Sequence, residues 1–265
     1  MIRYDFLQGS QEWINVRLGI PTASRFSDIL TPAKWELSKS AIGYRHELCA
    51  EWILGNPVKP FKHAWTDRGS NLEQEGLDAY AFEKNTPVEQ VGFITLDDGR
   101  AGASPDALVV GVAGGVENKT LSAVNHVAAL LGEADKYTMQ IAGQMWIGEL
   151  EWVDRVYFNP AMPLVIQRVE RDDALIDKLA GAVLEFCDRL DEMKSRLIGL
   201  GCKPIPPPTG NKPLPDDRPT EAELRELGDE FFGEPLPTPD FGPTEDRILQ
   251  VATGPLSRPK MAVWV

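Results

Sequence analysis

The segment between residues 90 and 119 constrains the fold more than any other part of the chain. It contains three short apolar stretches that are separated by Asp97-Asp98-Gly99 and by the glycine-rich run from Gly111 to Gly114. Short apolar stretches between turn-forming residues are typical of β-strands. The pattern therefore predicts three successive strands of a meander, over residues 90–96, 101–110 and 115–119.

Helical spacing of apolar residues precedes and follows this segment. It predicts helices over 25–30, 40–54 and 68–84, and the buried side of the last is expected to carry Leu72, Leu77, Tyr80 and Phe82. After the meander we expect a helix over 135–147, strands over 152–159 and 164–169, and a long amphipathic helix over 172–198. This order predicts an α/β or α+β fold in which helices pack on a central mixed sheet.

The chain changes character after residue 200. Residues 201–265 contain 13 of the 21 prolines, including three in a row from Pro206 to Pro208. Proline removes backbone donors and favours extended conformations. We therefore expect one domain over residues 1–200 and a proline-rich, extended tail over 201–265. The tail has one expected helical island near residues 220–229, where Thr220 and Glu223 could form a capping box.

Composition limits the function classes. No apolar run approaches the length of a membrane span and the N-terminus lacks a secretory signal pattern, so the expectation is a cytoplasmic protein that does not bind a membrane. Cys49, Cys187 and Cys202 are far apart, which disfavours disulfides, zinc ribbons and iron–sulfur clusters. The formal charge of −13 argues against a generally basic DNA-binding surface, although a local basic groove can coexist with an acidic exterior.

Two carboxylates and a lysine fall on neighbouring strands of the predicted meander. Glu117 and Lys119 are two positions apart, so their side chains project from the same face of a strand, and Asp106 joins them if the hairpin pairs. Hard oxygen ligands of this kind suit Mg²⁺, and Mn²⁺ can substitute. The lysine would add positive charge where an attacking hydroxide forms. Alone, the Asp and Glu-x-Lys pattern is weak, because exposed strands often carry such charges by chance.

The residues around this pattern make it more specific. Ser104-Pro105-Asp106-Ala107-Leu108 followed by Val116-Glu117-Asn118-Lys119-Thr120 resembles the paired catalytic motifs of the lambda exonuclease and YqaJ-type viral recombinase nucleases, which belong to the PD-(D/E)xK superfamily. Three more segments resemble the family in the same order, over about residues 8–160: Trp13 with Arg17-Leu18-Gly19 and Thr22-Ala23-Ser24, then Arg68 to Glu73, then Met139-Gln140 with Met145-Trp146.

The resemblance implies a restriction-endonuclease-like core and a role for each matched residue. Asp106, Glu117 and the backbone carbonyl of Asn118 would be metal ligands, Lys119 would be the catalytic lysine, and Glu73 would complete a second metal position. Glu75 is a rival for Glu73, and either could be an ordinary exposed helix carboxylate. Gln140 would hydrogen-bond the catalytic water or the lysine. The chain departs from the family two positions later, where Ala142 replaces a glutamine that is often present and Gln144 is shifted along.

The same resemblance implies that Arg17, Thr22 and Ser24 bind a terminal 5′-phosphate. An arginine with hydroxyls ahead of a helix suits a phosphate chemically. The alternatives are a structural salt bridge for Arg17 and a helix N-cap for Thr22 or Ser24. His46, His63 and His126 do not cluster in the sequence, so no rival hydrolase site is indicated.

The sequence therefore predicts a Mg²⁺-dependent 5′-to-3′ exonuclease that acts on double-stranded DNA ends and leaves 3′ single strands for recombination. Relatives of this kind form ring-shaped homotrimers and work with a single-strand annealing protein, and both partners are implied here by the resemblance alone. Two alternatives remain open: an endonuclease of the same fold, and a non-catalytic DNA-binding or protein-binding module.

Overall fold

A five-stranded mixed sheet carries Glu117, Asn118 and Lys119, and Asp106 directly precedes one of its strands. The computed structural model describes residues 1–59, 67–134 and 138–205. The strand order is β2-β5-β6-β7-β8, and only β6 and β7 pair in parallel. These strands are β2 (Val88–Glu89), β5 (Ala107–Val109), β6 (Gly114–Thr120), β7 (Trp152–Phe158) and β8 (Val165–Glu170). The parallel pair requires a crossover, which residues 121–151 provide.

The structure contains a second, three-stranded sheet, so the predicted meander is divided between two sheets. The second sheet contains β1 (Ile2–Tyr4), β3 (Phe93–Thr95) and β4 (Gly102–Ala103) in the order β1-β3-β4. The prediction of one strand over 101–110 was therefore wrong, because β4 and β5 belong to different sheets. Pro105 lies between them and has no backbone N–H to donate to a ladder, so the chain leaves one sheet and enters the other at this point.

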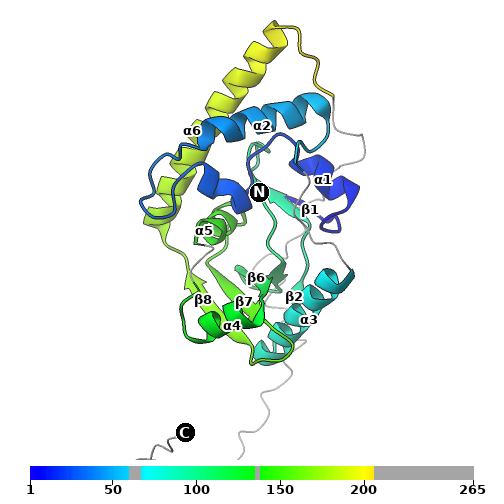
Figure 1. The fold of residues 1–265 in the computed structure, drawn as a ribbon, viewed down its shortest axis with the longest axis vertical. Coiled ribbons are helices and arrows are strands. Elements are labelled where there is room, and N and C mark those ends of the chain that lie inside the picture. The colour runs from blue at the N-terminus through cyan, green and yellow to red at the C-terminus, as the bar shows by residue number, and fades with distance from the viewer. Residues whose placement is uncertain (60–66, 135–137, 206–265) are drawn as a thin grey trace, which may run out of the picture. The chain divides into compact units, whose positions relative to one another are not determined.

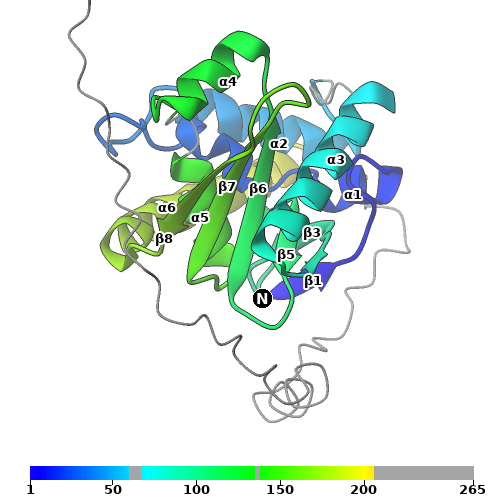
Figure 2. The same ribbon diagram turned by 90° about the horizontal axis from the view of Figure 1, so that it is seen from below.

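Helices cover both faces of the five-stranded sheet (Figures 1 and 2). Helix α3 (Asp67–Lys84) packs on β6 and β7, and α5 (Thr138–Ile147) contacts the same two strands. Side chains on a strand alternate between faces, and Asn118 contacts α3 whereas Glu117 contacts α5. The two helices therefore lie on opposite faces of β6. Residues 135–137, where the prediction began the second helix, are outside the described residues.

Besides α3 and α5, three predicted helices are present with small differences in their bounds, and two helices were not predicted. The former are the 3-10 helix η1 (Ala23–Asp28), α2 (Ala41–Leu54) and α6 (Asp173–Gly199), and the latter are α1 (Gln11–Arg17) and α4 (Ala123–Leu130). On α3, Leu77 and Tyr80 are buried as predicted. Phe82 is 88% exposed, so its assignment to the buried side was wrong. It is two positions from Tyr80, a step that reaches the other side of a helix.

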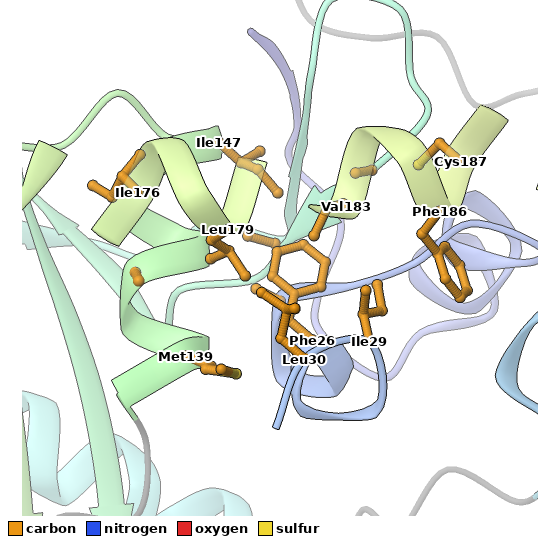
Figure 3. Packing of buried hydrophobic residues seen from close by; sticks show 14 of the residues in the cluster. Phe26, Ile29, Leu30, Met139, Ile147, Ile176, Leu179, Val183, Phe186 and Cys187 are labelled. Atoms are coloured by element: carbon orange, nitrogen blue, oxygen red, sulfur yellow. The ribbon is translucent and has the colours of Figure 1, made fainter. Parts of the chain in front are cut away.

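The larger core cluster joins η1, α5 and α6. Figure 3 shows Phe26 and Ile29 of the η1 region directed toward Leu179 and Val183 of α6. These four side chains are 0% exposed. A smaller cluster around Leu77, Tyr80 and Val116 fills the space between α3 and the sheet. Burial of apolar side chains on both faces fixes the sheet between its helices.

The described part of the chain ends just beyond α6. The backbone N–H of Ile205 donates to the carbonyl of Ile53, so residues after α6 return to the end of α2. Most of the predicted tail, with its helical island near 220–229, lies outside the described residues. No helix in the described ranges has the length and apolar character needed to cross a membrane.

Candidate active site

Asp106, Glu117 and Lys119 come together where β5 meets β6. Ala107 pairs with Val116 in the antiparallel register, which places Asp106 opposite Glu117. The backbone N–H of Asn118 donates to Asp106 Oδ2 at 2.6 Å. Lys119 Nζ lies 2.5 Å from Glu117 Oε1, so the two side chains share a face of β6. The register of one hairpin thus assembles the two acids and the lysine.

Two glutamines of α5 hold the Glu117 carboxylate, which is only 1% exposed. Gln140 Nε2 donates to Oε1 at 2.6 Å, and Gln144 Nε2 donates to Oε2 at 2.5 Å. The sequence predicted a role for Gln140 and none for Gln144. The spacing of Gln140 and Gln144 indicates that both could contact the same group, because residues four apart lie on the same face of a helix.

Glu73 approaches the acids from α3, and Asn118 fixes this part of the helix. Asn118 Nδ2 donates to the carbonyl of Glu73 at 2.9 Å. Gly76 allows this approach, since a Cβ built there would lie 2.5 Å from Asn118 Nδ2. Glu73 borders the cavity beside Asp106, whereas Glu75 is exposed and does not. The geometry favours Glu73 over Glu75 as the third acid.

The neighbouring carboxylates raise one another's pKa because little water reaches them. Burial, reinforced by the negative charge of Glu117, raises the pKa of Asp106 well above its ordinary value. Burial also raises the pKa of Glu73, with the nearby Lys119 acting in the opposite direction and Glu117 adding to the rise. Three neighbouring carboxylates with one lysine leave excess negative charge, and a divalent cation would relieve it.

The donor atoms of the acidic cluster determine which cation could bind there. Among the described residues, no group of three or more His, Cys, Asp and Glu side chains is arranged as a ready metal site. Both Glu117 oxygens are hydrogen-bonded to glutamine side chains. The donors themselves are carboxylate oxygens with a backbone carbonyl, the chemistry that Mg²⁺ prefers. The residues present therefore fit a hard divalent ion.

A cavity of about 420 Å³ opens beside Glu73 and Asp106. Its other walls come from the segment that links β1 to α1, from Gln74 on α3 and from the segment that precedes β3. The buried acids thus face a space that can admit part of a substrate.

Arg17 lies near the acids through a contact that the sequence did not reveal. Its Nη1 donates to Ser104 Oγ at 2.9 Å, and its guanidinium stacks over the Trp13 ring at 3.9 Å. Burial lowers the pKa of Arg17 to about 10. Ser104 is two residues before Asp106, and two residues of extended backbone span about 7 Å. An anion bound beside Arg17 would therefore lie close to the acids.

Thr22 and Ser24 are near each other, with their Oγ atoms 3.4 Å apart. Thr22 is buried and its N–H donates to the Tyr44 hydroxyl, while Ser24 is exposed. Thr22 occupies the N-cap position of η1, as one alternative proposed, but its side chain makes no cap hydrogen bond to the helix. Burial raises the pKa of Tyr44 to about 12, and the positive charge of Arg17 acts in the opposite direction.

The turn that follows Arg17 is held from two sides. Gly19 has a φ of +71°, and a Cβ there would lie 2.8 Å from Trp52 Cβ. Its N–H donates to Glu51 at 3.5 Å, and its carbonyl accepts a hydrogen bond from Lys194 of α6. Glycine is required at this position by conformation and by space. The turn directs the chain from Arg17 to Thr22.

The remaining cysteine and histidine positions form no rival site among the described residues. Cys49 and Cys187 are buried free thiols, and burial raises the pKa of Cys187 to about 12. His126 is fully buried and its Nε2 lies 2.8 Å from the Pro163 carbonyl. His63 lies outside the described residues.

Comparison with known proteins supports the resemblance stated for the sequence. The profile of the YqaJ-like viral recombinase domain matches residues 12–151, which is more than half of the chain. The crystal structure of an alkaline exonuclease, LHK-Exo, from Laribacter hongkongensis superposes with a TM-score of 0.64 and 30% identity, covering 72% of this chain and 98% of that one. The structure of LHK-Exo in complex with dAMP matches equally well. Curated proteins gave no significant match. The matched region contains Arg17, Glu73, Asp106, Glu117, Lys119 and both glutamines, and the chain belongs to the YqaJ-like viral recombinase family.

Proposed function

We propose that the protein is a Mg²⁺-dependent exonuclease that digests one strand of double-stranded DNA from its 5′ end and leaves a 3′ single strand. The observation that carries the proposal is the position of Arg17. It binds Ser104, two residues from Asp106, and so lies beside the cluster of Asp106, Glu117 and Lys119. A cationic anchor at this distance from the acids suits a terminal phosphate one nucleotide from the bond to be cleaved.

The similarity to LHK-Exo supports the coarser part of this proposal. That protein is described as an alkaline exonuclease, and one of its structures contains dAMP. Membership of the YqaJ-like viral recombinase family is consistent with a nuclease that acts on DNA during recombination. The cation, the 5′-to-3′ direction and the preference for a phosphorylated end are inferred from the site.

The acids would hold the cation, and neighbouring groups would orient them. Asp106, Glu117 and the Asn118 carbonyl would bind Mg²⁺, with Glu73 at a second position, and the ion would activate water and neutralise the phosphate oxygens. Gln140 and Gln144 keep the Glu117 carboxylate in one orientation. Its burial excludes bulk water, which strengthens electrostatic interactions in the site.

Lys119 would act on the phosphate and not on the cation. Its Nζ lies beside Glu117 Oε1, at the face where the phosphate would bind. The ammonium would stabilise the negative charge that develops as water attacks the phosphorus. Meanwhile Arg17, with the Ser104 hydroxyl, would hold the terminal phosphate and so fix which bond lies at the acids. Thr22 and Ser24 would add hydroxyl donors to this phosphate.

Digestion of a linear duplex labelled at either end tests the proposal. The reactions contain Mg²⁺ or EDTA and a duplex with or without a 5′-phosphate. We expect Mg²⁺-dependent loss from the 5′ end, faster with the phosphate, and a decrease of at least about 100-fold for Lys119→Ala. Internal cuts would instead indicate an endonuclease. An intact duplex would leave a binding module as the remaining alternative.

The family resemblance adds two proposals about partners. A ring-shaped homotrimer would place the basic residues of each chain along a channel, which would reduce the effect of the overall charge of −13 on DNA binding. A single-strand annealing protein would bind the 3′ strand as it is exposed. Light scattering of the full chain tests the first proposal.

A further inference from the structure

The peptide unit between Pro105 and Asp106 is fixed at both ends, although Pro105 belongs to neither sheet. Pro105 is buried between β4 and β5, and a buried backbone carbonyl needs a hydrogen-bond donor. Gln8 supplies that donor, because its Nε2 lies 2.9 Å from the Pro105 carbonyl oxygen. At the other end of the same peptide unit, the Asp106 N–H donates to the carbonyl of Val116 at 3.1 Å. Since a peptide unit is planar, the two bonds together fix its orientation.

Gln8 is itself held in place. The same Nε2 donates to the Val91 carbonyl at 2.9 Å, and only an amide nitrogen can donate to two carbonyl oxygens, so the orientation of the amide group is fixed. The chain around Gln8 lies against the residues that precede β3, because a Cβ built on Gly92 would lie 2.2 Å from the Phe6 carbonyl oxygen. Trp13 Nε1 also donates to the Gly92 carbonyl. The segment that links β1 to α1 therefore gives Gln8 a fixed support.

The hydrogen bond from Gln8 bears on the active site because the next residue is Asp106. A rotation of the peptide unit before Asp106 would turn its Cα–Cβ bond and move its carboxylate, whose Oδ2 lies 2.6 Å from the Asn118 backbone nitrogen. Groups that orient a metal ligand typically change the metal affinity about tenfold or more when they are removed. Gln8 precedes residues 12–151, which match the family profile, so that match assigns it no role.

We propose that Gln8 is a positioning residue of the active site, which holds the Pro105 carbonyl and so sets the direction in which Asp106 presents its carboxylate to the cation. This proposal rests on the proposed function, in which Asp106 is a ligand of that cation. Gln140 and Gln144 orient Glu117 by contacting its carboxylate. Gln8 orients Asp106 through the backbone, so its amide remains bonded to the two carbonyls when the cation is bound.

Gln8→Met tests the proposal, because methionine has a similar length and volume but no donor for the two carbonyls. Mn²⁺ binding to the metal-free protein, measured by calorimetry without DNA, should weaken about tenfold. The Mg²⁺ concentration for half-maximal digestion should rise by the same factor. The KM for the duplex and the preference for a 5′-phosphate should not change, because Arg17 keeps its hydrogen bond to Ser104. Thermal unfolding in EDTA measures the accompanying loss of stability.

His126→Leu is the matched control. His126 is buried and its Nε2 lies 2.8 Å from the carbonyl of Pro163, so this variant also removes a side-chain bond to a proline carbonyl between two strands. It should lower the melting temperature and leave Mn²⁺ binding unchanged. Gln8→Asn keeps the amide on a side chain one methylene shorter, and it should weaken Mn²⁺ binding less than Gln8→Met does. Gln8→Asn also provides the test if Gln8→Met does not fold.

The calorimetry separates this proposal from the proposed function. Unchanged Mn²⁺ affinity in the folded Gln8 variants, or an equal loss of affinity in His126→Leu, would overturn the positioning role of Gln8. A wild type that binds Mn²⁺ but leaves the duplex intact would overturn the proposed function alone, because the Mn²⁺ affinity of Gln8→Met still decides the role of Gln8. A wild type that binds no Mn²⁺ would overturn both.

Discussion

Ser104 connects the phosphate anchor to the acids, and it gives the first prediction. Its Oγ accepts hydrogen bonds from Arg17 Nη1 and from Trp13 Nε1. In Ser104→Ala, Trp13 keeps its bond to the Gly92 carbonyl, so the fold should be retained. Loss of a hydrogen bond to a charged group should lower the preference for a 5′-phosphate about tenfold. Competition between phosphorylated and unphosphorylated duplexes measures this preference, and an unchanged ratio would remove Ser104 from the anchor.

The two glutamines of α5 should differ in their effect on stability. Glu117 Oε1 is contacted by both Lys119 and Gln140, whereas the hydrogen bond shown for Oε2 comes from Gln144. Gln144→Leu should therefore leave a buried carboxylate oxygen unpaired and destabilise the fold by about 1–3 kcal/mol. Gln140→Leu should cost less. Thermal unfolding in EDTA measures both variants, and equal melting temperatures would contradict the asymmetry.

The sequence predicted some of these residues and not others, for identifiable reasons. Glu117 and Lys119 follow from the two-residue period of a strand, and Asp106 follows from the hairpin. Ser104 requires knowledge that α1 packs against the chain between β4 and β5, a contact between residues 87 positions apart. Local periodicity carries no information about such a contact. Gln144 could have been recognised from its spacing to Gln140, had the face of α5 been considered.

At the level of elements, the attachment of α3 to β6 decides where Glu73 lies. Asn118 uses its backbone N–H to hold Asp106 and its side-chain amide to hold the carbonyl of Glu73. Its Oδ1 is buried without a hydrogen-bond partner among the described residues, which carries a cost. Two helical turns further on, Tyr80 anchors the same helix through Asp154 at 2.8 Å.

Asn118→Leu should therefore weaken cation binding more than it weakens the fold. The apolar side chain has no donor for the Glu73 carbonyl, so the start of α3 should move away from the acids. We expect the Mg²⁺ concentration for half-maximal activity to rise about tenfold, the scale of a lost residue that orients a ligand. Mn²⁺ binding measured by calorimetry should weaken in parallel.

Tyr80→Phe is the control for this prediction. It removes the second attachment of α3 but leaves Asp154 paired with Arg168, so the melting temperature should fall while cation affinity is retained. If both variants shifted cation affinity equally, Asn118 would be only one of several residues that stabilise α3.

The sequence pattern predicted strands in this region but not which sheet each strand joins. The predicted strand over 101–110 looked continuous because alanines lie on both sides of Ser104-Pro105-Asp106 and valines follow. A proline ends a ladder but does not say which sheet the chain joins next. The distinction matters for the site, since Ser104 and Asp106 lie on the connection between the two sheets.

For the whole molecule, the acidic charge opposes DNA binding, and part of it can be removed. Residues 206–265 contain 6 Lys and Arg against 11 Asp and Glu, so they contribute −5 to the total of −13. The described residues end at Ile205. A chain that ends there should melt at nearly the same temperature as the full chain, because the core clusters lie within residues 1–205.

The shortened chain should bind a labelled duplex several-fold more tightly at about 10 mM salt, and the difference should disappear at about 150 mM. Charges separated by more than about 8 Å are largely screened at the higher concentration, whereas at the lower one screening extends to about 30 Å. Fluorescence anisotropy in EDTA measures binding without cleavage. A full-length variant with the 11 acidic residues of 206–265 changed to Asn or Gln keeps the chain length and should reproduce the gain. If only the shortened chain gained affinity, the length of the segment and not its charge would be what opposes DNA binding.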